Sequence, residues 1–329
     1  MFLYLFLLIF GLLIVIKAAD YLIDGASSIA SIYRVSPLVI GLTIVAFGTS
    51  SPELAISIFS AFNNSTALAF GNVIGSNIFN IAVILALSSI IYPLKIQSNT
   101  VWKEIPMSLV GAIAIFLLGL GHIIDGKVKI LEITNNRSVI GELTLSNGII
   151  LLIFFIIFIY YTFGIAGQKT EIKNNIKNIP FKKSLFYILL GLAGLVIGSR
   201  IIVKNAVYMA NFFNLSEKFI GLTIIAIGTS LPELAASVTA SYKKKADIAV
   251  GNIVGSNIFN IFLILGTTAI IKPVPIMLND VIDLGVMVII TLFLFVSYFI
   301  FHKGALDRWE GIILIIIYII YLNYLFTRT

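Results

Sequence analysis

The sequence predicts an all-α membrane protein with ten transmembrane helices, arranged as two inverted five-helix repeats. Of the 329 residues, 59% are hydrophobic and only 11% are charged, and the mean hydropathy is +1.08. Such a composition lies far outside that of a soluble domain, so lipid must surround most of the chain. A spanning helix needs roughly 20 mainly apolar residues, and a chain of this length has room for about ten.

Ten apolar runs follow one another along the chain. They lie at residues 3–30, 36–62, 67–91, 104–121, 147–167, 184–208, 218–241, 247–271, 281–301 and 309–326. Each run is continuous, whereas a membrane strand alternates apolar and polar residues over about ten positions, so the runs favour helices. The first run lacks a preceding basic segment, and we therefore expect it to be retained as a helix rather than cleaved as a signal peptide.

The positions of the basic residues predict the orientation. If the N-terminus lies outside, the inner loops contain 13 of the 22 Lys and Arg residues, and the more basic side is normally cytoplasmic. We therefore expect a multi-pass protein of the cell membrane with extracellular N- and C-termini. The net charge of +7 is dispersed over short loops, so we expect membrane lipid rather than nucleic acid as a partner.

Two windows of the first half recur in the second half. GLTIVAFGTSSPEL at 41–54 matches GLTIIAIGTSLPEL at 221–234 in 11 of 14 positions. GNVIGSNIFNI at 71–81 matches GNIVGSNIFNI at 251–261 in 9 of 11 positions, again at an offset of 180. Five spans separate the copies, and this odd number means that the second copy enters the membrane from the opposite side. Inverted repeats of this kind place a substrate site of many secondary transporters near the bilayer midplane.

The repeat divides the chain into two five-helix units. We predict the first repeat at 1–166, a polar basic linker at 167–183 and the second, inverted repeat at 184–329. A further polar stretch, roughly 125–147, interrupts the first repeat, and the sequence assigns it no role.

Each copy of the first window places small and oxygen-bearing residues on one helical stripe. Their spacing of i, i+3, i+4 and i+7 puts them on the same face. They are Ala46, Thr49, Ser50 and Glu53 in the first copy and Ala226, Thr229, Ser230 and Glu233 in the second. The inverted arrangement can therefore bring two carboxylates together from opposite sides of the membrane.

A proline interrupts each of these stripes. Pro52 and Pro232 lack the amide hydrogen that would bond to the carbonyls of Gly48 and Gly228. Such broken helices are tolerated in membranes where the released backbone lines a cavity, and free carbonyls are good ligands for hard cations.

The second window adds amides and hydroxyls at i, i+4 and i+8. The residues are Asn72, Ser76 and Asn80, and Asn252, Ser256 and Asn260. Together the two windows supply carboxylate, hydroxyl, amide and carbonyl oxygens, which suit calcium or sodium but not zinc or copper. Two buried glutamates would be neutralised by one calcium ion or by monovalent cations, and this competition for one site is the basis of antiport.

The paired GTSxPEL and GNxxGSNIxN motifs resemble the alpha repeats of the cation/calcium antiporter superfamily, most closely the prokaryotic sodium/calcium exchangers. The resemblance implies that Glu53 and Glu233 bind calcium with the backbone carbonyls of Thr49 and Thr229. It also implies alternating access, in which the first and sixth spans slide against the other eight.

The resemblance further implies flanking sodium sites that share the two glutamates. These sites would comprise Ala46, Ser50 and Ser76 on one side and Ala226, Ser230 and Ser256 on the other, with Asn80 and Asn260 lining the centre. The chain departs from the family at Asn260, where an aspartate is frequent. An amide there removes one ionisable group and weakens any potassium-dependent interpretation.

The expected function is therefore sodium/calcium exchange, with calcium and sodium as transported ions, no cofactor and a layout compatible with a monomer. Calcium/proton exchange is the first alternative because two glutamates also bind two protons. A cation channel is a weaker one, because channels usually gain their polar rings from oligomer symmetry. We expect no enzyme, since neither a serine with a basic partner nor a metal-binding histidine pair is visible.

Overall fold

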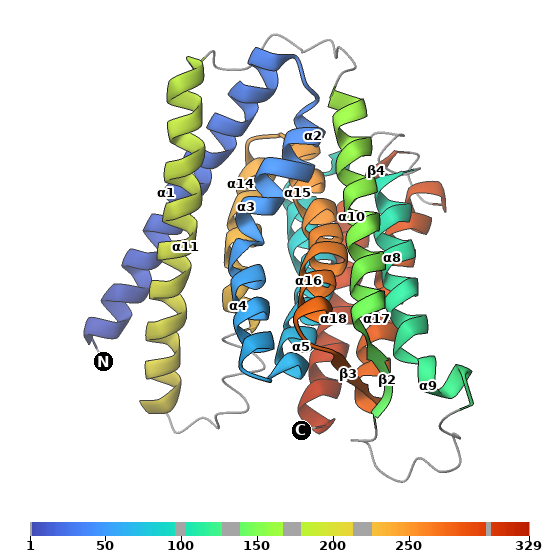
Figure 1. Cartoon of the computed structure of the whole chain (residues 1–329). Helices are drawn as coiled ribbons and strands as arrows, with labels where there is room; N and C mark the ends of the chain where they lie inside the picture. Colours follow the sequence, from blue (N-terminus) through green and yellow to red (C-terminus); the bar gives the residue numbers. More distant parts are fainter. Residues whose placement is uncertain are drawn as a thin grey trace.

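The computed structural model describes residues 2–95, 103–126, 139–166, 179–212, 226–300 and 304–328 and is mainly helical (Figure 1). The first half contains α1 (Phe2–Tyr33), α2 (Pro37–Ile40), η1 (Gly41–Val45), α3 (Ala46–Thr49), α4 (Ser51–Phe62), α5 (Thr66–Phe79), η2 (Asn80–Leu85), α6 (Ala86–Ile91), α8 (Glu104–Gly119), α9 (Gly121–Ile124) and α10 (Leu145–Ala166). The second contains α11 (Phe181–Phe212), α13 (Ala226–Thr229), α14 (Leu231–Tyr242), α15 (Ala246–Ile258), η5 (Phe259–Leu265), α16 (Gly266–Ile271), α17 (Leu278–Ile300) and α18 (Arg308–Arg328). The η segments are π-helical turns that continue the neighbouring α-helices.

Seven continuous helical spans in the described ranges are long and apolar enough to cross a bilayer. They are α1, α5–η2–α6, α10, α11, α15–η5–α16, α17 and α18. The stretch from α2 to α4 makes an eighth if its two parts, which meet at an angle of 46°, count as one span. The apolar helix α8 has 16 residues and is shorter than the seven continuous spans. Residues 213–225, before α13, lie outside the described ranges. The count of ten helices therefore remains a prediction.

The two central spans differ sharply from the outer ones in burial. In the most apolar 18-residue stretch of α15–η5–α16, 94% is buried, and in the equivalent stretch of α5–η2–α6 the share is 72%. The corresponding share is only 22% to 33% in the other five long spans, whose apolar side chains face outward. A helix that is apolar all round and buried is an interior helix, so these two spans form the core of the bundle.

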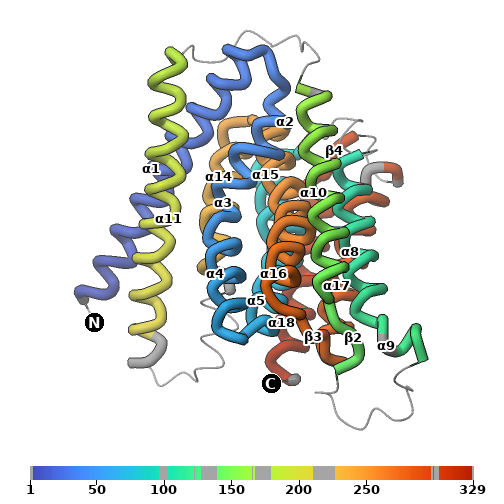
Figure 2. Tube along the Cα trace, in the orientation of Figure 1, coloured from blue at the N-terminus to red at the C-terminus, as the bar shows by residue number. Residues whose placement is uncertain are grey.

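Helices α1 and α11 form a separate pair at one edge of the molecule (Figures 1 and 2). Glycines allow them to pack closely: a Cβ atom on Gly191 would lie 2.7 Å from the backbone nitrogen of Leu22, and one on Gly25 would lie 2.7 Å from the Ser184 carbonyl oxygen. Small residues at such positions let membrane helices approach each other. The close packing extends along most of both helices.

Four short strands in the described ranges lie outside the spans and were not predicted by the all-α interpretation. They are β1 (Leu94–Lys95), β2 (Val139–Leu143), β3 (Val274–Met277) and β4 (Ala305–Leu306), and they pair antiparallel as β1 with β4 and β2 with β3. Each pair joins the strand after the third span of one half to the strand before the last span of the other half. Part of the polar stretch at 125–147 thus becomes β2, which connects the two halves.

Helices α4 and α14 end in the same way. Asn64 and Lys244, which follow them 180 residues apart, have φ angles of 60° and 58°. This left-handed conformation is uncommon for residues other than glycine and terminates a helix. The two halves thus share a turn conformation as well as a sequence.

Candidate cation site

The site is built where two apolar helices break, one in each half of the chain. Helix α3 ends at Thr49 and α4 begins at Ser51, so the break falls at Ser50, with Pro52 in the first turn of α4. The second half repeats this geometry: α13 ends at Thr229, the break falls at Ser230, and Pro232 lies in the first turn of α14. The φ and ψ angles of the two break serines are −82° and 3°, and −90° and 8°.

The glycines before the two breaks adjoin α11. A Cβ atom on Gly48 would overlap the side chain of Leu192, and one on Gly228 would overlap the side chain of Val203. Helix α11 therefore lies against both breaks at two different heights. The sequence analysis identified these glycines by the carbonyls that the prolines leave free, and the structure adds that the glycines make room for α11.

The two glutamates are buried at the start of α4 and α14. Glu53 and Glu233 each retain 1% of their exposed surface. Ser50 Oγ donates a hydrogen bond to Glu233 Oε1 at 2.9 Å, and Ser230 Oγ donates one to Glu53 Oε1 at 3.4 Å. Each carboxylate is thus reached by the break serine of the other half, which places both in one centre.

The second carboxylate oxygens are buried without a hydrogen-bond partner among the described residues. No Lys or Arg in those ranges forms an ion pair with Glu53 or Glu233. An uncompensated buried carboxylate is costly in a membrane interior. The two oxygens are therefore available to a cation.

The threonines before the breaks are held by asparagines of the core helices. Thr49 Oγ1 donates to Asn252 Oδ1 at 3.1 Å, and Thr229 Oγ1 donates to Asn72 Oδ1 at 3.3 Å. Asn252 Nδ2 donates in turn to Ser237 Oγ at 2.9 Å. These bonds hold the threonine hydroxyls and leave the backbone carbonyls as the threonine ligand atoms that the resemblance implies.

Four amides meet across the centre. Asn80 Nδ2 donates to Asn257 Oδ1 at 2.9 Å, and Asn260 Nδ2 donates to Asn77 Oδ1 at 3.0 Å. The oxygens of Asn80 and Asn260 are buried and have no hydrogen-bond partner in the described part of the chain. Asn77 and Asn257 were not among the predicted site residues, although they lie in the repeated GSNIFN segment and could have been found there.

The remaining predicted residues surround this centre. Ser76 Oγ accepts a hydrogen bond from Ser230 at 3.1 Å, although the resemblance assigns these two serines to opposite sodium groups. The hydroxyl of Ser256 is buried without a hydrogen-bond partner among the described residues, and Ala46 is fully buried. Ala226 begins α13, and residues 221–225 of the predicted motif lie outside the described residues.

The hydrogen bonds of the centre are reciprocal between the two halves. Each of the bonds from Thr49, Ser50 and Asn80 has a counterpart in which both partners are 180 residues away in the numbering. Two π-helical segments, η2 and η5, occupy matching places directly after α5 and α15, and such turns are frequent at functional sites. The centre is therefore a joint product of both halves.

The donor set fits a hard cation. Within the described ranges, no three His, Cys, Asp or Glu side chains gather in one place. The centre instead offers two carboxylates with neutral hydroxyl and amide oxygens. Calcium takes six to eight oxygen ligands of this kind, and sodium also prefers oxygen.

Comparisons with known proteins point in one direction. Residues 3–164 and 183–327 match the family described as "Sodium/calcium exchanger protein". The chain is 36% identical over 277 residues to the inner membrane protein YrbG of Escherichia coli, covering 81% of this chain and 79% of the relative. It is 31% identical over 343 residues to the sodium/calcium exchanger MaX1 of Methanosarcina acetivorans, covering 97% of both. A solved structure of the sodium-calcium exchanger NCX_Mj superimposes with a TM-score of 0.81 at 30% identity, covering 98% of both chains.

Proposed function

This chain belongs to the sodium/calcium exchanger protein family, and from that premise we propose that it exchanges sodium for calcium by alternating access at a two-glutamate site near the membrane midplane. It is a multi-pass membrane transporter rather than an enzyme. The observation that supports the site most strongly is the crossed pair of hydrogen bonds from Ser50 to Glu233 and from Ser230 to Glu53.

The charge of the centre explains why calcium and sodium would compete there. Two ionised carboxylates contribute two negative charges in a region of low dielectric constant, where an uncompensated charge is expensive. One calcium ion neutralises both, and so do two monovalent cations. We infer that the centre binds calcium and sodium alternately. The backbone carbonyls of Thr49 and Thr229 would be further calcium ligands, and the serine hydroxyls would be sodium ligands.

The α1–α11 pair is suited to the moving part. Its closely packed glycine interface favours movement of both helices together. Helix α11 also contacts the breaks at Gly48 and Gly228, which belong to opposite halves. A slide of the pair along the bundle would therefore change the covering of both breaks at once, as alternating access requires.

The same proposal includes the two inverted repeats at 1–166 and 184–329 and the extracellular position of both termini. The reciprocal hydrogen bonds at an offset of 180 support the repeat relationship. Accessibility of the C-terminus to an antibody tag in intact cells tests the orientation.

Calcium/proton exchange is the second candidate, because two carboxylates can also be neutralised by protons. Isotopic calcium uptake into proteoliposomes, with sodium and pH gradients imposed separately, decides between the two. We expect uptake only when sodium is loaded inside the vesicles. Uptake driven by a pH gradient without sodium would establish the proton alternative, and uptake without any opposing cation gradient would indicate a channel.

A further inference from the structure

Helices α1 and α11 carry ionisable residues at equivalent positions of the two repeats. At the offset of 180 that relates the repeated windows, Asp20 corresponds to Arg200 and Asp24 corresponds to Lys204. Two acidic residues of the first repeat are therefore replaced by two basic residues in the second. Ionisable side chains within a membrane span are costly and are usually retained for a function. Their matching positions indicate that this function involves both repeats.

The packing of α1 against α11 supports the register of this correspondence. A Cβ atom on Gly11 would lie 2.9 Å from the Ile202 side chain, and one on Gly191 would lie 2.8 Å from the Leu22 side chain. Gly191 is 180 positions after Gly11, and Ile202 is 180 positions after Leu22. The two helices therefore contact each other through equivalent residues, as an inverted repeat requires.

The acidic pair on α1 is bound to the turn between α14 and α15. Lys243 in this turn forms ion pairs with Asp20 at 3.1 Å and with Asp24 at 2.9 Å. Lys245 in the same turn lies 3.6 Å from Asp24. In this arrangement, α1 is therefore held against the second half of the bundle at the end where α14 finishes.

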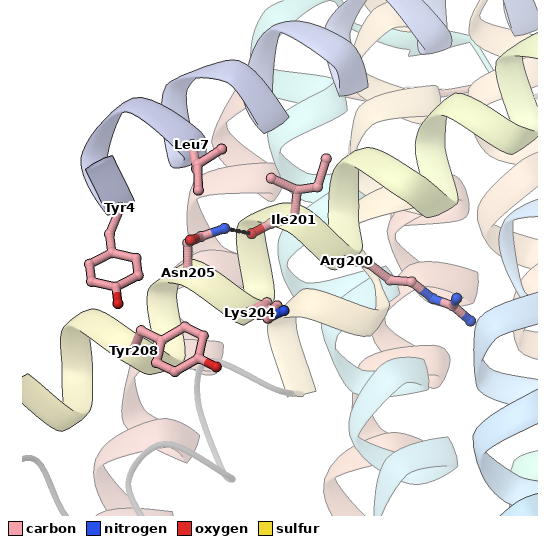
Figure 3. Close-up of a pocket in the computed structure, with 7 residues that line it drawn as sticks. All are labelled: Tyr4, Leu7, Arg200, Ile201, Lys204, Asn205 and Tyr208. Atoms are coloured by element: carbon pink, nitrogen blue, oxygen red, sulfur yellow. Dashed lines mark hydrogen bonds between the residues drawn. The ribbon is translucent and has the colours of Figure 1, made fainter. Parts of the chain in front are cut away.

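The basic pair on α11 has no equivalent contact. Arg200 and Lys204 are exposed beside an open groove, and neither has a carboxylate partner within the described ranges. Figure 3 shows that the Arg200 side chain points away from Tyr4 of α1. The neighbouring Val203 packs against the break at Gly228, so both cations lie at the depth of the cation site.

The α4–α5 turn is the counterpart of the α14–α15 turn. Asn63 corresponds to Lys243 and Ser65 corresponds to Lys245, so the counterpart turn is uncharged. In Figure 1 this turn lies at the lower end of the bundle, where α11 also ends, whereas α1 ends at the upper end. The last carbonyl groups of α4 carry the negative partial charge of the helix dipole, and Arg and Lys side chains bind such carbonyls. The turn is therefore a suitable partner for the two cations of α11.

We propose that Arg200 and Lys204 bind the α4–α5 turn in the opposite arrangement of the transporter, in which Asp20 and Asp24 have left the α14–α15 turn. This inference rests on the proposed alternating access and names the contact that closes the second side. Because the repeats are inverted copies, exchanging their conformations opens the opposite face of the membrane. A contact that one repeat makes in the first arrangement is then made by the equivalent residues of the other repeat.

The test is thiol cross-linking of the full-length protein in membrane vesicles. The sequence contains no cysteine, so two introduced cysteines are the only thiols. The pair Lys204→Cys/Ser65→Cys is equivalent to the contact between Asp24 and Lys245, and it leaves Arg200 in place. A short bis-maleimide should link this pair. Absence of the link would overturn the proposal.

The matched control is the pair Ile201→Cys/Ser65→Cys. Ile201 lies one turn before Lys204 on α11 and faces α1, since a Cβ atom on Gly11 would lie 3.2 Å from its side chain. No link should form in this pair. Equal linking of the two pairs would show that α11 approaches the turn without using the face that carries the cations, and would also overturn the proposal.

A second measurement adds the missing charge. Asn63→Asp, introduced into the Lys204→Cys/Ser65→Cys protein, gives Arg200 a carboxylate partner and should raise the cross-linking rate roughly two- to fivefold. Arg200→Gln should cancel this increase, and an increase that persists would contradict the contact. Cross-linking is measured without transport. Normal sodium/calcium exchange without the cross-link would therefore refute this inference alone, whereas a cross-link in a chain that exchanges no sodium for calcium would refute the proposed function alone.

Discussion

The hydroxyl of Ser50, from the first half of the chain, donates a hydrogen bond of 2.9 Å to the carboxylate of Glu233, from the second half. The equivalent bond from Ser230 to Glu53 is longer, at 3.4 Å, and Ser230 Oγ also lies 3.1 Å from Ser76 Oγ, so its single hydroxyl hydrogen is shared between two acceptors. The two halves of the centre are therefore similar but not identical. A substitution in one half should not have the same effect on transport as its counterpart in the other half.

Neutralising either glutamate should nearly abolish calcium transport. Removing one charge from a buried, charge-compensated site costs roughly 2–5 kcal/mol, so the apparent calcium affinity of Glu53→Gln or Glu233→Gln should fall at least roughly 30-fold. Sodium-driven calcium uptake in proteoliposomes measures this apparent affinity. Glu142→Gln, in β2 outside the centre, is the control and should transport normally. Wild-type uptake in either centre variant would remove the proposed ligands.

The helical spans and the polar centre could be predicted because hydropathy and the repeated windows both report on burial. The run predicted at 247–271, for example, corresponds to α15–η5–α16 at 246–271. The strands β1 and β4 were missed because two residues each carry no periodic signal. The π-helical turns were missed because nothing in their composition distinguishes them from α-helix.

The pairing of side chains within the centre could be predicted less well. The i, i+4, i+8 stripe singled out Asn80 and Asn260 but passed over Asn77 and Asn257, which provide their amide partners. A stripe of polar residues identifies which face of a helix is polar, but it does not show how that helix is rotated relative to the neighbouring helix. The contact between Ser76 and Ser230 depends on that rotation, so it required coordinates.

Removing the hydroxyl of Ser50 should weaken sodium coupling. Ser50→Ala deletes a proposed sodium ligand and the 2.9 Å bond to Glu233, and a hydrogen bond to a charged group contributes about 1.5–3 kcal/mol. We expect the sodium concentration for half-maximal calcium release from vesicles to rise roughly tenfold. Ser51→Ala is the matched control, because the adjacent Ser51 is more exposed and its hydroxyl donates to the Phe47 carbonyl rather than to a residue of the centre. Equal shifts in the two variants would contradict a specific role for Ser50.

An acid at position 260 should make transport pH-dependent. Asn260 donates to Asn77 Oδ1 at 3.0 Å, and a protonated aspartic acid can keep this bond whereas an ionised one cannot. Calcium flux of Asn260→Asp relative to wild type should therefore be near normal at low pH and fall roughly tenfold as pH rises. Asn260→Ala cannot titrate, so its deficit should be the same at every pH. A flat pH profile for the aspartate variant would show that this bond does not control transport.

Adding one methyl group to Gly255 should separate α15 from the first-half motif. A Cβ atom there would lie 2.7 Å from the Leu42 carbonyl oxygen and 2.8 Å from Ala46 Cβ, and the former is backbone that cannot turn aside. Gly255→Ala should lower the free energy of unfolding by about 1–3 kcal/mol and reduce calcium flux. Thermal unfolding in detergent measures the first effect. Gly164→Ala, with nothing within 4 Å, should be neutral, and a neutral Gly255→Ala would disprove the close contact.

The last prediction concerns the connection between α1 and the rest of the bundle. Lys243, in the turn after α14, pairs with Asp20 at 3.1 Å and with Asp24 at 2.9 Å, both on α1. If α1 and α11 slide as proposed, this ion cluster resists the movement in the arrangement seen here. The partners are 22% to 39% exposed, so each pair contributes only about 0.2–1 kcal/mol.

Lys243→Gln should therefore raise the maximal calcium exchange rate by roughly two- to fivefold, because less free energy is needed to leave this arrangement. Lys244→Gln is the matched control, since Lys244 is the next residue and has no carboxylate partner among the described residues. Asp24→Asn should act in the same direction as Lys243→Gln, and combining the two should give less than the product of the single effects, because both remove the same contact. Fully multiplicative effects, or an equal increase in the Lys244 variant, would show that the cluster does not restrain α1.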